Sequence, residues 1–431
     1  MADEKTLSNL RADGEVIASY QHLSELPLVV AGAHGPYLTD DTGRDIIDIT
    51  AGACTMNLGY GILKGEEYAS FPFPYASGLK QVELAKRLAR HYPCLKPEEV
   101  RVGFGVCGSE AIDGAIKLCR AFTGRKKIVT FEGDYHGTTL GSVALTTLPG
   151  RISDRFAPLL PEVYTLPFCD ETASEEDIDE CLLKLAYMDY ETIAGFIIET
   201  VQGDMGMLPM HQRLMSTLYH IAKSWGIAFV VDEVQMAFYR TGPFFAIENY
   251  ADVVPDAIVM GKSLGGGIPL SAIMGRKEFM DSLGPCEHAF SMAGNSEACA
   301  RGLKFLDVIE GAGFRETLEA RMMELYDGLQ RLEKQHPRAV SHLTGIGFAF
   351  GLWIKSVKEG ESDAQAAFKV MYRAFELGLY TMRLGSNWLR IEPSLNIDRE
   401  VLAKALSILN TALADYEAGR ISDEVLTWML K

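Results

Sequence analysis

The chain has 431 residues, a hydrophobic content of 48% and a formal net charge of −17 at pH 7. Its length predicts two or three domains, because a single compact core seldom organises so many residues. The negative charge argues against binding to nucleic acid or to an acidic membrane surface, since both repel an acidic protein. No apolar run reaches the roughly 18 residues of a membrane span, and the charged beginning, "MADEKTLSNLRADGEV", is unlike a signal peptide. We therefore expect a cytoplasmic protein.

The cysteines fit the expected cytoplasmic location, and the histidines bear on whether the chain binds a metal. The eight cysteines form no CxxC pair and most lie in apolar segments, so we expect them to be reduced core residues. The histidines are scattered, with no HxxxH spacing and no Cys/His cluster, so no metal site is expected.

Strand-like and helix-like segments alternate from about residue 100. The expected strands are apolar runs at 100–105, 126–133, 193–200, 227–234 and 256–263. The expected helices include 109–122 and 211–225, the second with apolar residues at helical spacing. Apolar strands separated by helices indicate an α/β fold with a mostly parallel central sheet covered on both faces. Ligands of such sheets bind at the carboxyl ends of the strands.

The pattern of predicted elements changes near residue 300, where long charged helices precede shorter strands and a last helix. We therefore expect three parts. An N-terminal segment, 1–50, packs with the small domain. A large domain covers 51–300, and a smaller α+β C-terminal domain covers 301–431.

Two of the expected strand ends carry residues suited to a flat, anionic ligand. Gly108 and Ser109 follow the first strand and open a helix, where free N–H groups and the helix dipole favour phosphate. An ordinary capped helix start is the alternative. Tyr135 and His136 follow the second strand. The Tyr135 ring can lie on a flat ligand ring or simply pack.

An acid and a lysine follow two further strands. Asp232 ends the run "IAFVVD", and burying such an acid is costly unless a cation, such as a protonated ring nitrogen, pairs with it. Lys262 follows "AIVM" and is surrounded by glycines in "MGKSLGGGIP". A lysine at a strand end is usually a solvated charge. However, lysine also forms Schiff bases with carbonyl ligands, and glycine lets the backbone approach a ligand closely.

Together these strand ends supply the groups that hold pyridoxal 5′-phosphate. They are a helix start that can bind the phosphate, an aromatic side chain that can stack on the ring, a carboxylate for the ring nitrogen and a lysine that can form a Schiff base. Over nearly its whole length the chain resembles the class III aminotransferase family, in segments such as "CGSEAIDGAIKLCRAFTG", "DYHGTTLGS", "FVVDEVQMAFYRTG", "PDAIVMGKSLGGGIPLSAI" and "HAFSMAGNSEA". The resemblance implies pyridoxal phosphate-dependent fold type I. It also implies a homodimer, alone or paired into a tetramer, with active sites shared between subunits.

The resemblance also implies roles for single residues. Lys262 holds the cofactor, Asp232 pairs with its ring nitrogen, and Gln235 lies near a cofactor oxygen. Ser291, where the family usually has threonine, reaches the phosphate of the partner chain's site. The implied cofactor-binding residues are Gly108, Ser109, Tyr135, His136, Glu199, Asp232, Gln235, Lys262 and Ser291.

The expected reaction depends on what faces Lys262. Most of the family are transaminases, in which one lysine can move the proton on one face. Racemisation needs a second acid–base group on the opposite face, and Asp204, in "VQGDMGM", is the candidate. A loop-ordering aspartate is the alternative.

Two stretches, 260–298 and 413–424, are similar to the isoleucine 2-epimerase branch of the family. We therefore predict an amino-acid racemase or epimerase with Lys262, Asp204 and Tyr135 as catalytic residues. An aminotransferase is the alternative.

Two further residues are expected to contact the substrate. Arg390, in "NWLRIEPSL", matches a family arginine that meets a substrate carboxylate, which points to a free amino acid. A surface salt bridge is the alternative. Phe73 lies in "SFPFPYASG", a segment that is shorter than in the family and that there lines the substrate channel. Its ring shapes the pocket or simply packs.

Overall fold

The structure is a computed structural model that describes residues 3–16, 25–63, 78–149, 156–383 and 386–429. The chain divides into two compact units. The large unit is Leu63–Gly311, and the small unit combines Met1–Ile62 with Ala312–Lys431. Both boundaries lie somewhat later in the chain than the positions expected from the sequence, 50 and 300.

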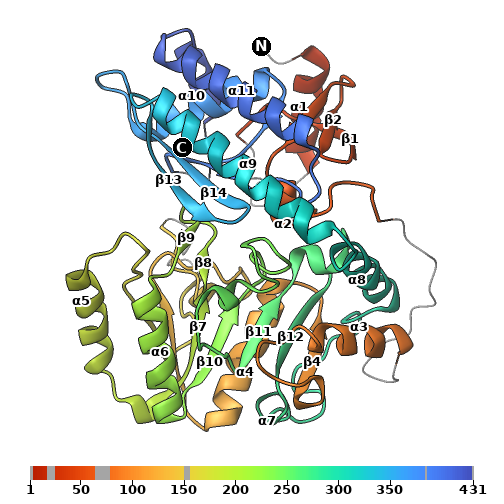
Figure 1. Ribbon diagram of the computed structural model, residues 1–431, viewed down its shortest axis with the longest axis vertical. Helices are drawn as coiled ribbons and strands as arrows, with labels where there is room; N and C mark the ends of the chain where they lie inside the picture. Colours follow the sequence, from red (N-terminus) through yellow and green to blue (C-terminus); the bar gives the residue numbers. More distant parts are fainter. Residues whose placement is uncertain (1–2, 17–24, 64–77, 150–155, 384–385, 430–431) are drawn as a thin grey trace. The chain divides into compact units, whose positions relative to one another are not determined.

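The large unit is built on a seven-stranded sheet (Figure 1). In spatial order its strands are β4 (Val100–Gly105), β12 (Ser271–Arg276), β11 (Ala257–Met260), β10 (Ala228–Asp232), β7 (Ile193–Glu199), β5 (Lys127–Phe131) and β6 (Val163–Leu166). Strand β12 runs antiparallel to both of its neighbours, whereas the pairs among β11, β10, β7, β5 and β6 are parallel. The mostly parallel α/β sheet that the apolar runs predicted is therefore confirmed.

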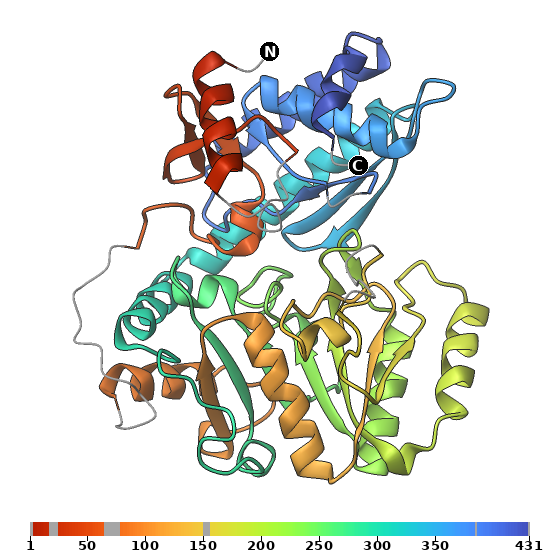
Figure 2. The same ribbon diagram turned by 180° about the vertical axis from the view of Figure 1, so that it is seen from behind.

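Helices cover both faces of this sheet. Helix α4 (Gly108–Thr123) lies on the face seen in Figure 2, and α6 (Gln212–Trp225) lies on the face seen in Figure 1. The side chains of each strand alternate between these layers: Val230 packs in the core cluster with α4, while the neighbouring Phe229 ring meets Tyr219 of α6. Both helices end at a left-handed glycine, as the C-cap position favours. The other helices of this unit are α3 (Leu79–Ala89), α5 (Glu175–Ala186), α7 (Lys277–Met280) and α8 (Ser296–Ile309).

The small unit joins the two ends of the chain. Its four-stranded sheet has the order β1 (Val30–His34), β2 (Tyr37–Asp40), β3 (Asp45–Asp48) and β15 (Leu379–Tyr380), with β15 parallel to β3. A second, antiparallel sheet contains β13 (Val340–Ile346), β14 (Ala349–Ile354) and β16 (Trp388–Ile391). The helices are α1 (Glu4–Val16), α2 (Ala51–Cys54), α9 (Phe314–Gln335), α10 (Asp363–Glu376) and α11 (Arg399–Glu417). The N-terminal segment thus packs within the same unit as the C-terminal part.

Within the described ranges, no helix is both long and apolar enough to cross a membrane. All eight cysteines are free; Cys54, Cys119, Cys169, Cys181 and Cys299 are buried, whereas Cys94, Cys107 and Cys286 are exposed. The expectation of core cysteines therefore holds for five of them.

Candidate active site

A cavity of about 180 Å³ lies in the large unit, at the carboxyl ends of its parallel strands. The register places Asp232, the last residue of β10, beside Glu199, the last residue of β7. Parallel strands bring such end residues to one edge of the sheet, as the sequence argument expected. Of the residues predicted from the sequence, those around this cavity are Gly108, Ser109, Tyr135, His136, Glu199, Asp204, Asp232, Gln235 and Lys262.

The start of α4 forms one wall of the cavity. Gly108 is the first residue of the helix and Ser109 the second, so their N–H groups belong to the turn that has no intrahelical acceptors. Gly137 has φ +116°, and a Cβ built on it would lie 2.1 Å from Ser109 Oγ. The backbone N–H of Thr138 donates to Ser109 Oγ at 3.2 Å. A glycine-lined helix start of this kind suits a phosphate group.

The buried His136 forms a hydrogen bond with the carboxylate of Asp232. His136 Nδ1 lies 2.7 Å from Asp232 Oδ2, and His136 Nε2 lies 3.3 Å from Asp134 Oδ2. Burial disfavours the charged imidazole, but hydrogen bonds and charges from Asp134 and Asp232 outweigh it and raise the His136 pKa to about 10. His136 is therefore a cation at neutral pH. Asp232 Oδ1 accepts from the N–H of Val234 at 3.0 Å, and the carboxylate also borders the cavity, where it can meet a protonated ring nitrogen.

Glu199 ties two segments of the cavity wall together. Its Oε1 accepts from the N–H of Tyr135 at 2.6 Å, and its Oε2 accepts from the N–H of Gly203 at 3.1 Å. Burial and the nearby Asp134 charge raise the pKa of Glu199. The carboxyl group thus fixes the segment with the half-buried Tyr135 ring and the turn that precedes Asp204.

Lys262 begins a short 3-10 turn that is separated from β11 by Gly261. It has φ 46°, a backbone conformation that costs a residue other than glycine about 1–3 kcal/mol and is concentrated at functional sites. Its Nζ donates to Oε1 of Gln235, which also borders the cavity. The lysine is half-buried, and the hydrogen bond holds its amine beside Gln235.

Asp204 reaches the same cavity from a different element. The strands β8 (Val201–Gln202) and β9 (Leu208–Pro209) pair as a hairpin after β7, and Asp204 lies in its turn. The side chain is half-buried. The structure therefore brings Asp204 and Lys262 to one cavity, although 58 positions separate their numbers in the sequence.

Two predicted residues, Ser291 and Arg390, are not among the described residues that line this cavity. Ser291 is exposed. Arg390, on β16 of the small unit, is 2% exposed, and its Nε lies 3.5 Å from Oε2 of the buried Glu392. Arg390 therefore does form a salt bridge, as the alternative expected, but the pair is buried and does not lie at the surface. Phe73 lies outside the described residues.

Asp134 and Gln202 support the cavity wall through His136, and the sequence did not predict either residue. Asp134 is fully buried, and its Oδ1 accepts from Gln202 Nε2 at 2.8 Å. The available signal was the spacing of Asp134 two residues before His136 in "GDYHG". An acid and an imidazole so close in an apolar setting need each other as partners.

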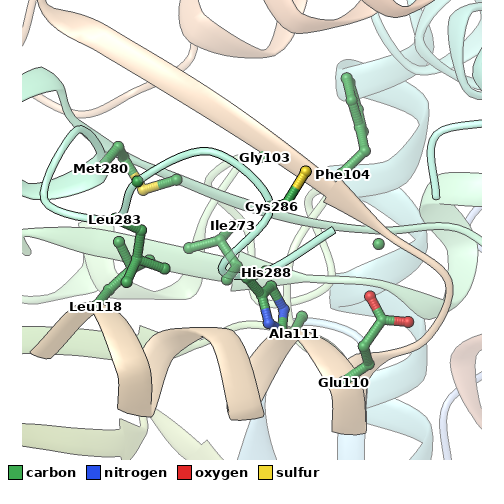
Figure 3. A pocket seen from close by; sticks show the side chains of 12 residues that line it. Gly103, Phe104, Glu110, Ala111, Leu118, Ile273, Met280, Leu283, Cys286 and His288 are labelled. Atoms are coloured by element: carbon green, nitrogen blue, oxygen red, sulfur yellow. The ribbon is translucent and has the colours of Figure 1, made fainter. Parts of the chain in front are cut away.

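A second cavity, of about 150 Å³, is lined by residues of α4, β4 and β12 and of the segment that begins at α7 (Figure 3). Apolar side chains, including Leu118, Met280 and Leu283, share it with Glu110 and His288. Burial raises the pKa of Glu110 and lowers that of His288. Among the described residues around it there is none that the sequence predicted for cofactor or substrate.

Taken together, the first cavity fits pyridoxal phosphate: a helix start for the phosphate, a charge-supported carboxylate for the ring nitrogen and an amine for the aldehyde. Fold and site define a pyridoxal phosphate-dependent enzyme of fold type I. A sequence model of the family described as "Aminotransferase class-III" matches residues 19–413. The chain belongs to this family, and its cofactor is pyridoxal 5′-phosphate.

Among characterised relatives, the chain is 34% identical to an isoleucine 2-epimerase of Lentilactobacillus buchneri, with 92% of each chain covered. It is also 34% identical to a leucine/methionine racemase of Thermococcus litoralis, with 94% of each covered. A probable 4-aminobutyrate aminotransferase of Bacillus subtilis is 32% identical, with 90% of this chain and 92% of the relative covered. The similarity to the epimerase branch that the sequence indicated is confirmed.

Solved structures agree on the fold. An aminotransferase of Bacillus anthracis matches with a TM-score of 0.82 and 27% identity, covering 96% of this chain and 99% of that one. A transaminase of the marine bacterium Virgibacillus matches with a TM-score of 0.83 and 23% identity, covering 96% of this chain and all of that one.

Proposed function

We propose that this chain is a pyridoxal phosphate-dependent amino-acid racemase or epimerase that inverts the α-carbon of a free amino acid. Lys262 and Asp204 act as the two acid–base groups on opposite faces. The observation that supports this proposal is the presence of both side chains at one cavity, carried by two separate elements, the turn after β11 and the β8–β9 hairpin. The epimerase and racemase relatives at 34% identity add support.

Pyridoxal phosphate, when bound, withdraws electrons from the α-carbon of an amino acid and so makes its α-proton acidic. Lys262 removes or returns this proton on one face, and Asp204 does so on the other. Asp232, supported by the His136 cation, would hold the protonated ring nitrogen. The N–H groups at the start of α4 would hold the phosphate, and Tyr135 would contact the cofactor ring.

Three further assignments belong to the same proposal. The enzyme is a homodimer in which Ser291 reaches the phosphate of the partner's site; the exposed Phe290 and Met292, which flank it, suit a subunit contact. Arg390 binds the substrate carboxylate through its guanidinium group. Phe73 borders the substrate.

Amino transfer is the second candidate function, because aminotransferases also occur among the relatives, including the one at 32% identity. In that reaction Lys262 moves the proton on a single face. Asp204 then only orders the turn between β8 and β9.

Proton NMR in deuterated water separates the two functions. The enzyme with pyridoxal phosphate and one L-amino acid, without a keto acid, is expected to lose the α-proton signal while chiral chromatography detects the D-enantiomer. Asp204→Asn is expected to abolish inversion, because the amide cannot exchange the proton. Asp252→Asn, a change in an exposed turn with φ 63°, is the matched control. Exchange without inversion in the wild type, with amino transfer once pyruvate is added, would replace the racemase by a transaminase.

A further inference from the structure

The turn that carries Asp204 packs against the amide that holds Lys262. Gly203 directly precedes Asp204, and a Cβ built on Gly203 would lie 2.8 Å from Nε2 and 2.9 Å from Cδ of Gln235. Oε1 of the same carboxamide accepts the hydrogen bond from Lys262 Nζ. The packing of Gly203 against Gln235 therefore links the positions of the two proposed proton carriers.

Buried polar groups anchor this turn from behind. Gly203 N–H donates to Glu199 Oε2 at 3.1 Å, and the other oxygen of Glu199 is held by Tyr135 N–H. One residue earlier, Gln202 Nε2 donates to Asp134 Oδ1 at 2.8 Å. Because these partners lie in the buried floor of the site, the turn cannot retreat from Gln235 without breaking hydrogen bonds that are costly to lose.

We infer that Gly203 is a positioning residue that sets the separation between Lys262 and Asp204, and with it the specificity for inversion. This inference rests on the proposed two-base function. The backbone of Gly203 is not in the left-handed region, so an alanine is compatible with its dihedral angles. The added methyl group instead collides with the carboxamide of Gln235, and because the turn is anchored, the carboxamide is the part that shifts and takes its hydrogen-bond partner Lys262 with it.

The test compares inversion with α-proton exchange in one sample. Exchange of the α-proton with solvent needs a single acid–base group, whereas inversion of the α-carbon needs both groups at the correct separation. Gly203→Ala is expected to lower the ratio of inversion to exchange by about 10²-fold, the loss that a displacement of roughly 1 Å causes. Gly103→Ala is the matched control, because its Cβ would meet Met280 Cε at an ordinary 3.6 Å. An unchanged ratio in Gly203→Ala would overturn the inference.

A second readout needs no turnover. In the cofactor-free enzyme, Gly203→Ala is expected to lower the thermal unfolding midpoint in the wild-type background but not in a Gln235→Ala background, which lacks the colliding atoms. The double variant is therefore also the one expected to fold if the single variant does not. Equal destabilisation in both backgrounds would mean that the methyl group meets something other than Gln235, and the inference would fail.

The two proposals fail in different ways. If the wild-type enzyme exchanges without inverting, the two-base function and the specificity role of Gly203 fall together, while the unfolding cycle still decides whether Gly203 packs on Gln235. If the wild type inverts and Gly203→Ala inverts equally well, only the role of Gly203 is overturned.

Discussion

Replacing His136 with glutamine removes a buried cation that lies between Asp232 and Asp134. The pKa of His136 rises from 6.5 to about 10 against the cost of burial, which corresponds to about 5 kcal/mol at about 1.36 kcal/mol per pKa unit. Removing one partner from a buried ion pair costs about 3–5 kcal/mol, because the remaining charge is uncompensated. We therefore expect His136→Gln to lose several kcal/mol of unfolding free energy, measured by denaturant titration at neutral pH.

The pH dependence gives this prediction a sign. Because the folded-state pKa is raised, the stabilisation by His136 is complete below pH 6.5 and is lost as the pH rises towards about 10. In this window the histidine contributes a decline of about 1.4 kcal/mol per pH unit, since the folded state holds one proton more than the unfolded state. The decline should be absent from His136→Gln.

The control is His220→Gln, a change at an exposed position on α6. It should leave both the stability and its pH slope as in the wild type, since surface substitutions usually change stability by less than about 0.5 kcal/mol. A His136→Gln enzyme that is as stable as this control, with the wild-type pH slope, would refute the assignment of a buried imidazolium.

Two further substitutions test the cofactor seat. Lys262→Ala should leave the purified enzyme without the yellow colour of the covalently held cofactor, whereas the exposed Lys277→Ala should keep it; a yellow Lys262→Ala protein would contradict the role of this amine. Gly137→Ala places a methyl group 2.1 Å from Ser109 Oγ at φ +116°, so it should weaken pyridoxal phosphate binding by titration, at a strain of about 1–3 kcal/mol. Gly124→Ala, which also has a positive φ but open space around it, separates backbone strain from this collision.

The central sheet and its ligand edge were predictable because their causes are local. The apolar runs that became β7, β10 and β11 are buried at every residue, and such runs belong to parallel strands covered on both faces. Once the strands are parallel, their end residues share one edge, so Asp232 and Lys262 had to approach each other.

Other features depend on contacts that no local pattern encodes. The support of His136 by Asp134 depends on how one turn directs two side chains, and the meeting of Gly203 with Gln235 joins separate loops. Arg390 lies in a short strand whose partners determine that it is buried, so the sequence alone did not show that its salt bridge with Glu392 lies in the interior. The sequence also predicted longer strands at 227–234 and 256–263. The observed strands β10 and β11 end earlier, at Asp232 and Met260, where the chain turns towards the cavity.

The small unit has a consequence for how the protein is made. Strand β3 pairs on one side with β15, through Ile47 with Leu379 and Asp48 with Tyr380. During synthesis the whole of the large unit, Leu63–Gly311, and part of the small unit emerge between these partners. Leu379 follows Asp48 by 331 positions, a delay of roughly 17 to 66 seconds at about 5–20 residues per second. Until then β3 has an unpaired edge of the kind that invites association with other chains. We therefore expect the edge of β3 to need protection from association while the rest of the chain is being synthesised.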